Sequence, residues 1–212
     1  SKYIIRITRL CAINIVLALS MNLVNGFTGI FSLGHAGFMA IGAYTVALLT
    51  IPVAKKETIF MLEPLIAPLN TLTLPFGAAL VIGGLLAAAL AFLIGLPCLR
   101  LRGDYLAIAT LGFSEIIRIV ITNAQSLTNG AQGLKSIPAT ANIWWCYGVA
   151  LATIIFIALL ISSSYGRAFK AIREDEIAAE SMGVSLLRHK MLSFMLSAFL
   201  AAVGGGLFAS YI

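Results

Sequence analysis

The chain of 212 residues is 60% hydrophobic and 10% charged, whereas soluble globular domains carry about 25% charged residues. This composition excludes a soluble globular protein and indicates an integral membrane protein. The net charge of +6 comes from basic residues at the ends of apolar segments. That placement follows the positive-inside pattern of membrane proteins and argues against nucleic-acid binding.

Six apolar stretches follow one another along the chain, and each is long enough to cross a bilayer core of roughly 30 Å as a helix. Abundant Ala, Gly, Ser and Thr within them favour close helix packing over a single membrane anchor. The sequence therefore predicts an all-α, polytopic transmembrane helix bundle of about six spans. The predicted spans are 3–21, 33–51, 74–97, 104–123, 142–163 and 191–212.

The residues between the first two predicted spans are rich in glycine and in polar side chains. Glycine permits irregular backbone, and irregular backbone at membrane depth is where transporters commonly place their pathways. We therefore expect a translocation pathway close to this segment. The candidate pathway residues are Asn22, Asn25, Gly26, Gly29, Ser32 and His35.

His35 is an ionisable residue within a predicted membrane segment, and such residues are functional candidates. It either lines the pathway as a hydrogen-bonding or proton-linked group, or bonds a neighbouring carbonyl at a helix start. The structural role is favoured. No second His, Cys or acidic residue lies nearby in the sequence, so no metal site is predicted, and the sequence indicates no cofactor.

Glu115 and Arg118 stand three residues apart in the fourth predicted span and can form an ion pair on one helical face. Pairing inside a bundle would avoid unpaired charges in hydrocarbon. The pair is either a substrate contact or gate, or a structural clamp near the outer end of the helix. The structural clamp is the favoured interpretation.

Residues 165–190 hold four of the eight acidic residues of the chain and lie between two apolar spans. Basic residues at both flanks mark this stretch as a cytoplasmic loop. Asp175 is a good N-cap and Gly183 a natural C-terminal stop, which predicts a short helix between them. About two turns of helix are unstable alone, so we expect tertiary contact on one side and insertion into a partner groove on the other.

A cytoplasmic position for residues 165–190 sets the direction of the other spans. Counted back along the chain, span 33–51 starts on the cytoplasmic side, yet Lys2, Arg6 and Arg9 would also hold the N-terminus inside. Residues 22–32 would then cross as extended chain, at about 3.3–3.6 Å per residue, with their backbone satisfied by protein or water. This unwound crossing is preferred to an external N-terminus followed by an ordinary loop into a glycine-rich helix.

Three groups of residues carry a resemblance that spans nearly the whole chain. The sequence resembles the permease subunits of bacterial ABC importers for branched-chain amino acids, of the LivM type. The third group is similar to the coupling loop of that family, with Ile177 where the related EAA motif has Glu. The matching residues are Asn22, Leu23, Gly26, Gly29 and Ser32 to His35; Leu101 to Tyr105, Leu111, Gly112, Glu115 and Arg118; and Tyr165 to Ala168, Ala171 to Glu174, Ala178, Ala179 and Gly183.

The resemblance implies one membrane-spanning permease domain over residues 1–212, incomplete at its C-terminus because family members continue with further helices. It also implies a bacterial cytoplasmic (inner) membrane location and four kinds of contact: a second related permease subunit, two cytoplasmic ATPases, a periplasmic substrate-binding protein and the lipid bilayer. Within the coupling loop, 165–190, the residues expected to meet the ATPases are Arg173, Glu174, Asp175, Glu176, Ala178, Ala179 and Gly183.

The chain has no GxxxxGK(S/T) phosphate-binding loop, so ATP hydrolysis is expected on partner subunits and the chain itself is expected not to be an enzyme. The resemblance points to branched-chain amino acids as the solute, with urea as the alternative, because urea importers use similar permeases. An ion-coupled transporter or channel would need more membrane-buried charges than Glu115 and Arg118. An intramembrane enzyme would need a Ser–His or paired-Asp constellation, which the sequence lacks.

Overall fold

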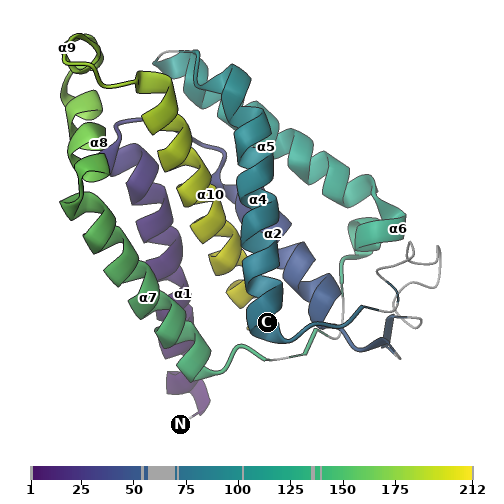
Figure 1. Ribbon diagram of the computed structural model, residues 1–212. Helices are drawn as coiled ribbons and strands as arrows, with labels where there is room; N and C mark the ends of the chain where they lie inside the picture. Colours follow the sequence, from purple (N-terminus) through teal and green to yellow (C-terminus); the bar gives the residue numbers. More distant parts are fainter. Residues whose placement is uncertain are drawn as a thin grey trace.

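The computed structural model describes residues 2–53, 55–56, 70, 72–101, 103–134, 137–138 and 140–211. Every regular element within these residues is helical (Figure 1). Five helices are long and apolar enough to cross a membrane, and a sixth apolar helix is shorter. The predicted all-α polytopic bundle is therefore confirmed. Arg102, from the second group of matching residues, lies outside the described part of the chain.

Six apolar helices build the bundle and correspond in order to the six predicted spans. They are α1 (Lys2–Asn22), α2 (His35–Thr50), α4 (Phe76–Cys98), α5 (Asp104–Asn123), α7 (Ile143–Ser162) and α10 (Leu186–Ala209). Between them lie the π-helical turn η1 (Leu23–Phe27), α6 (Gln125–Thr128), the 3₁₀ turn η2 (Gly130–Gln132), α8 (Ser164–Glu174) and α9 (Glu176–Ser181). The last span begins earlier than predicted, because α10 includes the charged residues just before residue 191.

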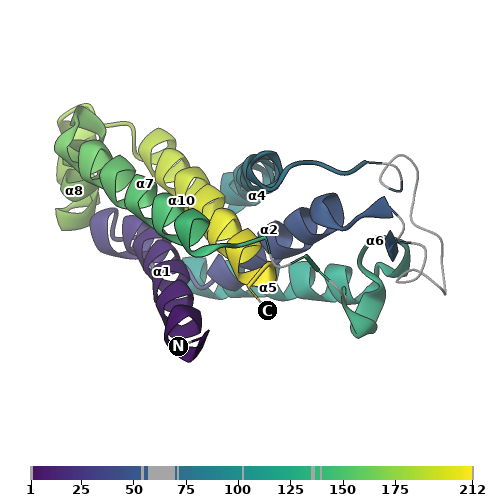
Figure 2. The ribbon, with the colours of Figure 1, turned by 90° about the horizontal axis from the view of Figure 1, so that it is seen from below.

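α10 lies at the centre of the bundle, against α1, α2 and α4 (Figure 2). Small residues allow it to approach α2 closely. A Cβ atom on Gly205 would overlap the carbonyl oxygen of Met39, and one on Gly42 would overlap that of Ala202. Lipid tails are as apolar as the helices, so this close van der Waals packing is a principal source of their association.

The chain enters the bundle at the end opposite α9, as the positions of α1 and α7 show (Figure 1). Near the start of α1, the Arg9 guanidinium donates to the Ala141 carbonyl oxygen (3.2 Å), and the Tyr147 hydroxyl donates to the Thr8 carbonyl oxygen (3.3 Å). These contacts place the start of α1 beside the start of α7. α1 then runs towards the end that carries α8 and α9, which we call the α9 end.

The preferred extended crossing is therefore wrong, and the direction of α1 matches the alternative with an N-terminus opposite the 165–190 loop. Arg6 and Arg9 suggested an N-terminus on the same side as the 165–190 loop, but both make contacts within the chain at the end opposite α9. Arg9 meets a carbonyl oxygen there, and the Arg6 guanidinium lies 5.9 Å from the centre of the Tyr211 ring. The connection itself is non-helical from residue 28 to residue 34, with Thr28, Ile30 and Ser32 buried, and α2 leads back from the α9 end.

Candidate functional site: the α9 loop and the α1–α2 junction

α8 leads from α7 to α9 and is an amphipathic helix that lies within the predicted loop. Gly166, Phe169 and Ile172 are buried, whereas Arg167 and Lys170 are exposed. The buried residues recur at three-residue spacing, which is the signal that could have revealed this helix from the sequence. α8 packs against α7, α10 and η1, so it fixes the position of α9.

α9 is the short helix predicted between Asp175 and Gly183, and it is present. The Asp175 carboxylate accepts hydrogen bonds from the backbone N–H groups of Ile177 (2.8 Å) and Ala178 (3.0 Å), as an N-cap does. Gly183 follows the helix with a φ of +86°, a left-handed conformation that glycine adopts without cost. Ala179 is buried, whereas the side chains of Ile177 and Met182 are 73% and 85% exposed.

Glu176 ties α9 to the central helix. Its Oε1 atom lies 2.6 Å from Lys190 Nζ, and the Lys190 side chain is only 7% exposed. A buried lysine without a partner would be costly, so this ion pair holds the start of α10 against α9. Glu176 is a predicted ATPase contact, and the structure places its carboxylate in an internal contact of the chain.

Arg173 connects α8 to the end of α1. Its Nη2 atom lies 2.6 Å from Glu174 Oε1, and its Nη1 atom donates to the Gly26 carbonyl oxygen at 3.2 Å. Gly29 has a φ of +73°, and a Cβ atom there would lie 2.7 Å from Arg173 Cγ. Arg173, predicted for ATPase coupling, is therefore in direct contact with Gly26 and Gly29, which are predicted for the pathway.

The α1–α2 junction, residues 23–34, joins the π-helical turn η1 to a non-helical segment, and hydroxyl side chains bind some of its backbone polar groups. The Ser193 hydroxyl of α10 donates to the Leu23 carbonyl oxygen at 3.3 Å and lies 2.6 Å from the Thr28 hydroxyl. The Leu33 N–H group donates to the Thr110 hydroxyl of α5 at 3.1 Å. Irregular backbone at membrane depth is stable only with such partners, and the structure supplies them from two neighbouring helices.

His35 begins α2 and lies inside the bundle. The Ser197 hydroxyl donates to the Ser20 carbonyl oxygen (2.9 Å), so it accepts from His35 Nε2, 2.7 Å away. Because the Ser197 hydroxyl has one proton and donates it to Ser20, the proton between Ser197 and His35 belongs to His35. His35 is therefore the Nε2–H tautomer. His35 Nδ1 is buried and has no hydrogen-bond partner among the described residues.

The other predicted pathway residues differ in environment. Ser32 is buried and its N–H group donates to Asn25 Oδ1 at 3.2 Å, whereas Asn22 is exposed. The hydroxyl groups that hold this junction were not predicted from the sequence. Ser193 and Ser197 stand four residues apart, hence on one face of an apolar helix, and that spacing was the available signal.

Glu115 and Arg118 form an ion pair on the outer face of α5. Arg118 Nε lies 2.9 Å from Glu115 Oε2 and 3.0 Å from Oε1. Their side chains are 49% and 69% exposed, respectively. The pair is thus formed on a surface of this chain, not within its bundle.

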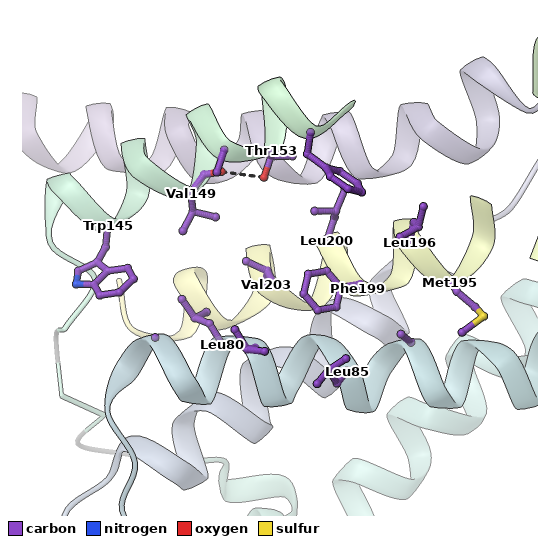
Figure 3. Close-up of a pocket in the computed structure, with 15 residues that line it drawn as sticks. Leu80, Leu85, Trp145, Val149, Thr153, Met195, Leu196, Phe199, Leu200 and Val203 are labelled. Atoms are coloured by element: carbon purple, nitrogen blue, oxygen red, sulfur yellow. Dashed lines mark hydrogen bonds between the residues drawn. The ribbon is translucent and has the colours of Figure 1, made fainter. Parts of the chain in front are cut away.

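A pocket of about 590 Å³ lies between α4, α7 and α10 (Figure 3). Its lining is apolar, with residues such as Leu80, Phe199 and Val203. The Thr153 hydroxyl is turned onto its own helix, where it donates to the Val149 carbonyl oxygen at 2.8 Å. Such a pocket offers no partner for the charged groups of a polar solute. Among the described residues, no group of three or more His, Cys, Asp or Glu could hold a metal ion.

Comparison with known proteins places these features in a family. The family model "Branched-chain amino acid transport system / permease component" matches residues 3–212. The chain is 38% identical over 244 residues to the high-affinity branched-chain amino acid transport system permease protein LivM of Escherichia coli (strain K12), covering 99% of this chain and 53% of that protein. The protein of the same name in Salmonella typhimurium (strain LT2) is 36% identical, with the same coverage.

A more distant relative is the probable branched-chain amino acid transport permease protein LivM of Methanocaldococcus jannaschii, which is 23% identical over 229 residues, 92% of this chain and 64% of that protein. The chain spans about half the length of the two bacterial relatives, at 53%. No solved structure matches it. The match over residues 3–212 and the five membrane-length helices show that the chain is a multi-pass membrane protein that belongs to the family of branched-chain amino acid transport permease components.

Proposed function

We propose that the chain is the core of a permease subunit of an ATP-driven importer for branched-chain amino acids in the bacterial cytoplasmic membrane. Its partners would be a second, related permease subunit, two cytoplasmic ATPases and a periplasmic substrate-binding protein. The names and the family of the relatives support this proposal. ATP hydrolysis would take place on the partner ATPases, and the permease would supply the pathway.

The observation that carries the proposal is the build of the α9 loop, residues 165–190. α9 is capped by Asp175, presents Ile177 and Met182 outwards, and is anchored on its inner side by Ala179 and Glu176. A short helix that is anchored on one side and exposes apolar side chains elsewhere is suited to contact with a groove of another protein. Residues 165–190 would then be the coupling loop within one permease domain.

The inner contacts of this loop indicate how movement would reach the pathway. Glu176 is tied to Lys190 at the start of α10, and Arg173 is tied to Gly26 in the α1–α2 junction. A shift of α9 would therefore be passed to the central helix and to the segment that contains Ser32 and His35. We assign Asn22, Asn25, Gly26, Gly29, Ser32 and His35 to the neighbourhood of the pathway, in agreement with this connection.

The test is co-purification and transport with the full-length permease and its partner subunits. Charge reversal at Glu174, an outward-facing residue of the loop, should weaken retention of the ATPases and reduce ATP-dependent uptake of leucine in proteoliposomes. Reversal at Lys55, in the segment after α2, is the control and should leave retention unchanged. Full retention and full uptake in the Glu174 variant would contradict the coupling role of this loop.

The solute is tested separately with the wild-type complex. Leucine, isoleucine or valine should stimulate ATP hydrolysis in the presence of the substrate-binding protein, and urea should not. Stimulation by urea alone would replace the amino-acid assignment while it keeps the import function.

A further inference from the structure

The Glu115–Arg118 pair lies at a depth where charge is costly in lipid. α5 begins at the α9 end, and Glu115 and Arg118 lie about 16 Å and 21 Å along its axis at about 1.5 Å per residue, on a helix about 30 Å long. Glu115 therefore lies near the middle of the helix, and Arg118 lies about 8 Å before its end at Asn123. Ionisable groups at such a depth almost always face the interior of a bundle or a water-filled cavity.

The bundle does not cover this pair. α5 buries Leu106, Ala107 and Thr110 against its neighbours. Glu115 projects from the opposite side of the helix and Arg118 from its flank, with side chains 49% and 69% exposed. The exposed faces of α4 and α7 differ, because these two helices contain no charged residue. Those faces suit lipid, and the outer face of α5 does not.

Space is also open along this face. Gly112 lies one turn before Glu115, and no atom lies within 4 Å of the position that its Cβ would take. Ile108 and Ile119 continue the face above and below the pair and are themselves exposed. The surface therefore carries apolar side chains on both sides of one ion pair, which suits an amphipathic solute.

We propose that the outer face of α5 lines a water-filled section of the translocation pathway, and that Glu115 and Arg118 bind the charged head group of a zwitterionic solute there. This inference rests on the import function proposed above. The Glu115 carboxylate can accept from an ammonium group, and the Arg118 guanidinium can donate to a carboxylate. Arg118 uses Nε and Nη2 for Glu115 and makes no hydrogen bond through Nη1 within the described residues, so one edge is available to a ligand.

The first test measures access of water to this face. Single cysteines are introduced at Gly112 and Ile119 in a cysteine-free, full-length permease assembled with its partner subunits, and are treated with a membrane-impermeant thiosulfonate. Both positions should react. Two control positions should not react: Leu93, which is on the lipid-facing side of α4, and Ala107, which is on the buried side of α5. Protection of both test positions would overturn the pathway assignment.

The second test measures head-group binding through uptake of leucine. Glu115→Gln should raise the KM for uptake by about ten- to hundredfold, because the ammonium group would then meet a neutral amide instead of a carboxylate. The swapped variant E115R/R118E keeps an ion pair but reverses its polarity, so it should not restore the KM. An unchanged KM in Glu115→Gln, or recovery in the swapped variant, would overturn head-group binding and indicate a structural clamp.

The two tests separate this inference from the proposed function. Labelling requires no change to the ion pair, so it decides the pathway assignment even where Glu115→Gln prevents assembly. If the wild-type complex shows no ATP-dependent uptake of leucine, the proposed function fails. Reaction at Gly112 and Ile119 would in that case still support a water-filled passage along α5.

Discussion

Gly205 and Gly42 are single residues on which the central packing of the bundle depends. Each lies where α10 and α2 approach backbone to backbone, and a methyl group at Gly205 would overlap the Met39 carbonyl oxygen. We expect Gly205→Ala to lower the free energy of unfolding by about 1–3 kcal/mol through overpacking. Thermal unfolding of the full-length subunit in detergent measures this. Gly148→Ala in α7, with no atom near the added methyl, is the control and should not destabilise.

The same scale shows which residue roles could be predicted. Asp175 and Gly183 were correctly placed at the ends of a short helix, because capping and left-handed backbone depend on local sequence. The basic residues Arg6 and Arg9 were misleading, since their partners, Tyr211 and Ala141, are distant in the sequence. Roles fixed by neighbours along the chain are accessible from sequence, and roles fixed by tertiary contacts are not.

At the scale of elements, the capping of α9 can be separated from the charge of its cap. Asp175→Ala removes the acceptor for two backbone N–H groups and should cost the helix about 1 kcal/mol, whereas Asp175→Asn keeps an acceptor. We expect the Ala variant to lose amide-exchange protection in α9 and to retain less ATPase on co-purification, with the Asn variant close to wild type. Equal losses in both variants would show that the negative charge matters more than the cap.

The Glu176–Lys190 ion pair between α9 and α10 is expected to stabilise the fold. Glu176→Ala leaves the buried Lys190 without its carboxylate partner and should lower the free energy of unfolding by about 1–3 kcal/mol. The double variant E176A/K190M should recover part of this loss, because the unpaired charge is removed. Glu174→Ala breaks an exposed pair with Arg173 and should cost about 0–1 kcal/mol. Thermal unfolding of the three variants measures the differences.

The elements also show how much of the candidate site was accessible from sequence. All six apolar helices were predicted, five of them of membrane length, because a long continuous apolar run is the direct mark of a helix that crosses the bilayer. α8 was missed, since its charged residues suggested a loop, although Phe169 and Ile172 are buried. The hydroxyl groups of Ser193 and Ser197 were also missed, because their purpose appears only once the α1–α2 junction is packed beside them.

For the whole molecule, the structure links two regions that the sequence presents as separate. Arg173 joins the α9 loop to the α1–α2 junction, and Glu176 joins it to the central helix. The proposed coupling surface, the central helix and the proposed pathway therefore form one connected body. Movement imposed on α9 by a partner protein would reach residues near His35 through these direct contacts.

The direction of the helices determines which segments of the chain share one side of the membrane. Because α1 runs towards the α9 end, the start of α1 and η2 should lie on one side of the membrane and α9 on the other. Single cysteines at Tyr3, Gln132 and Met182 in the cysteine-free full-length permease test this with an impermeant thiol reagent. Tyr3 and Gln132 should react in right-side-out vesicles, and Met182 in inverted vesicles. Reaction of Tyr3 together with Met182 would restore the positive-inside arrangement and the extended crossing of residues 22–32.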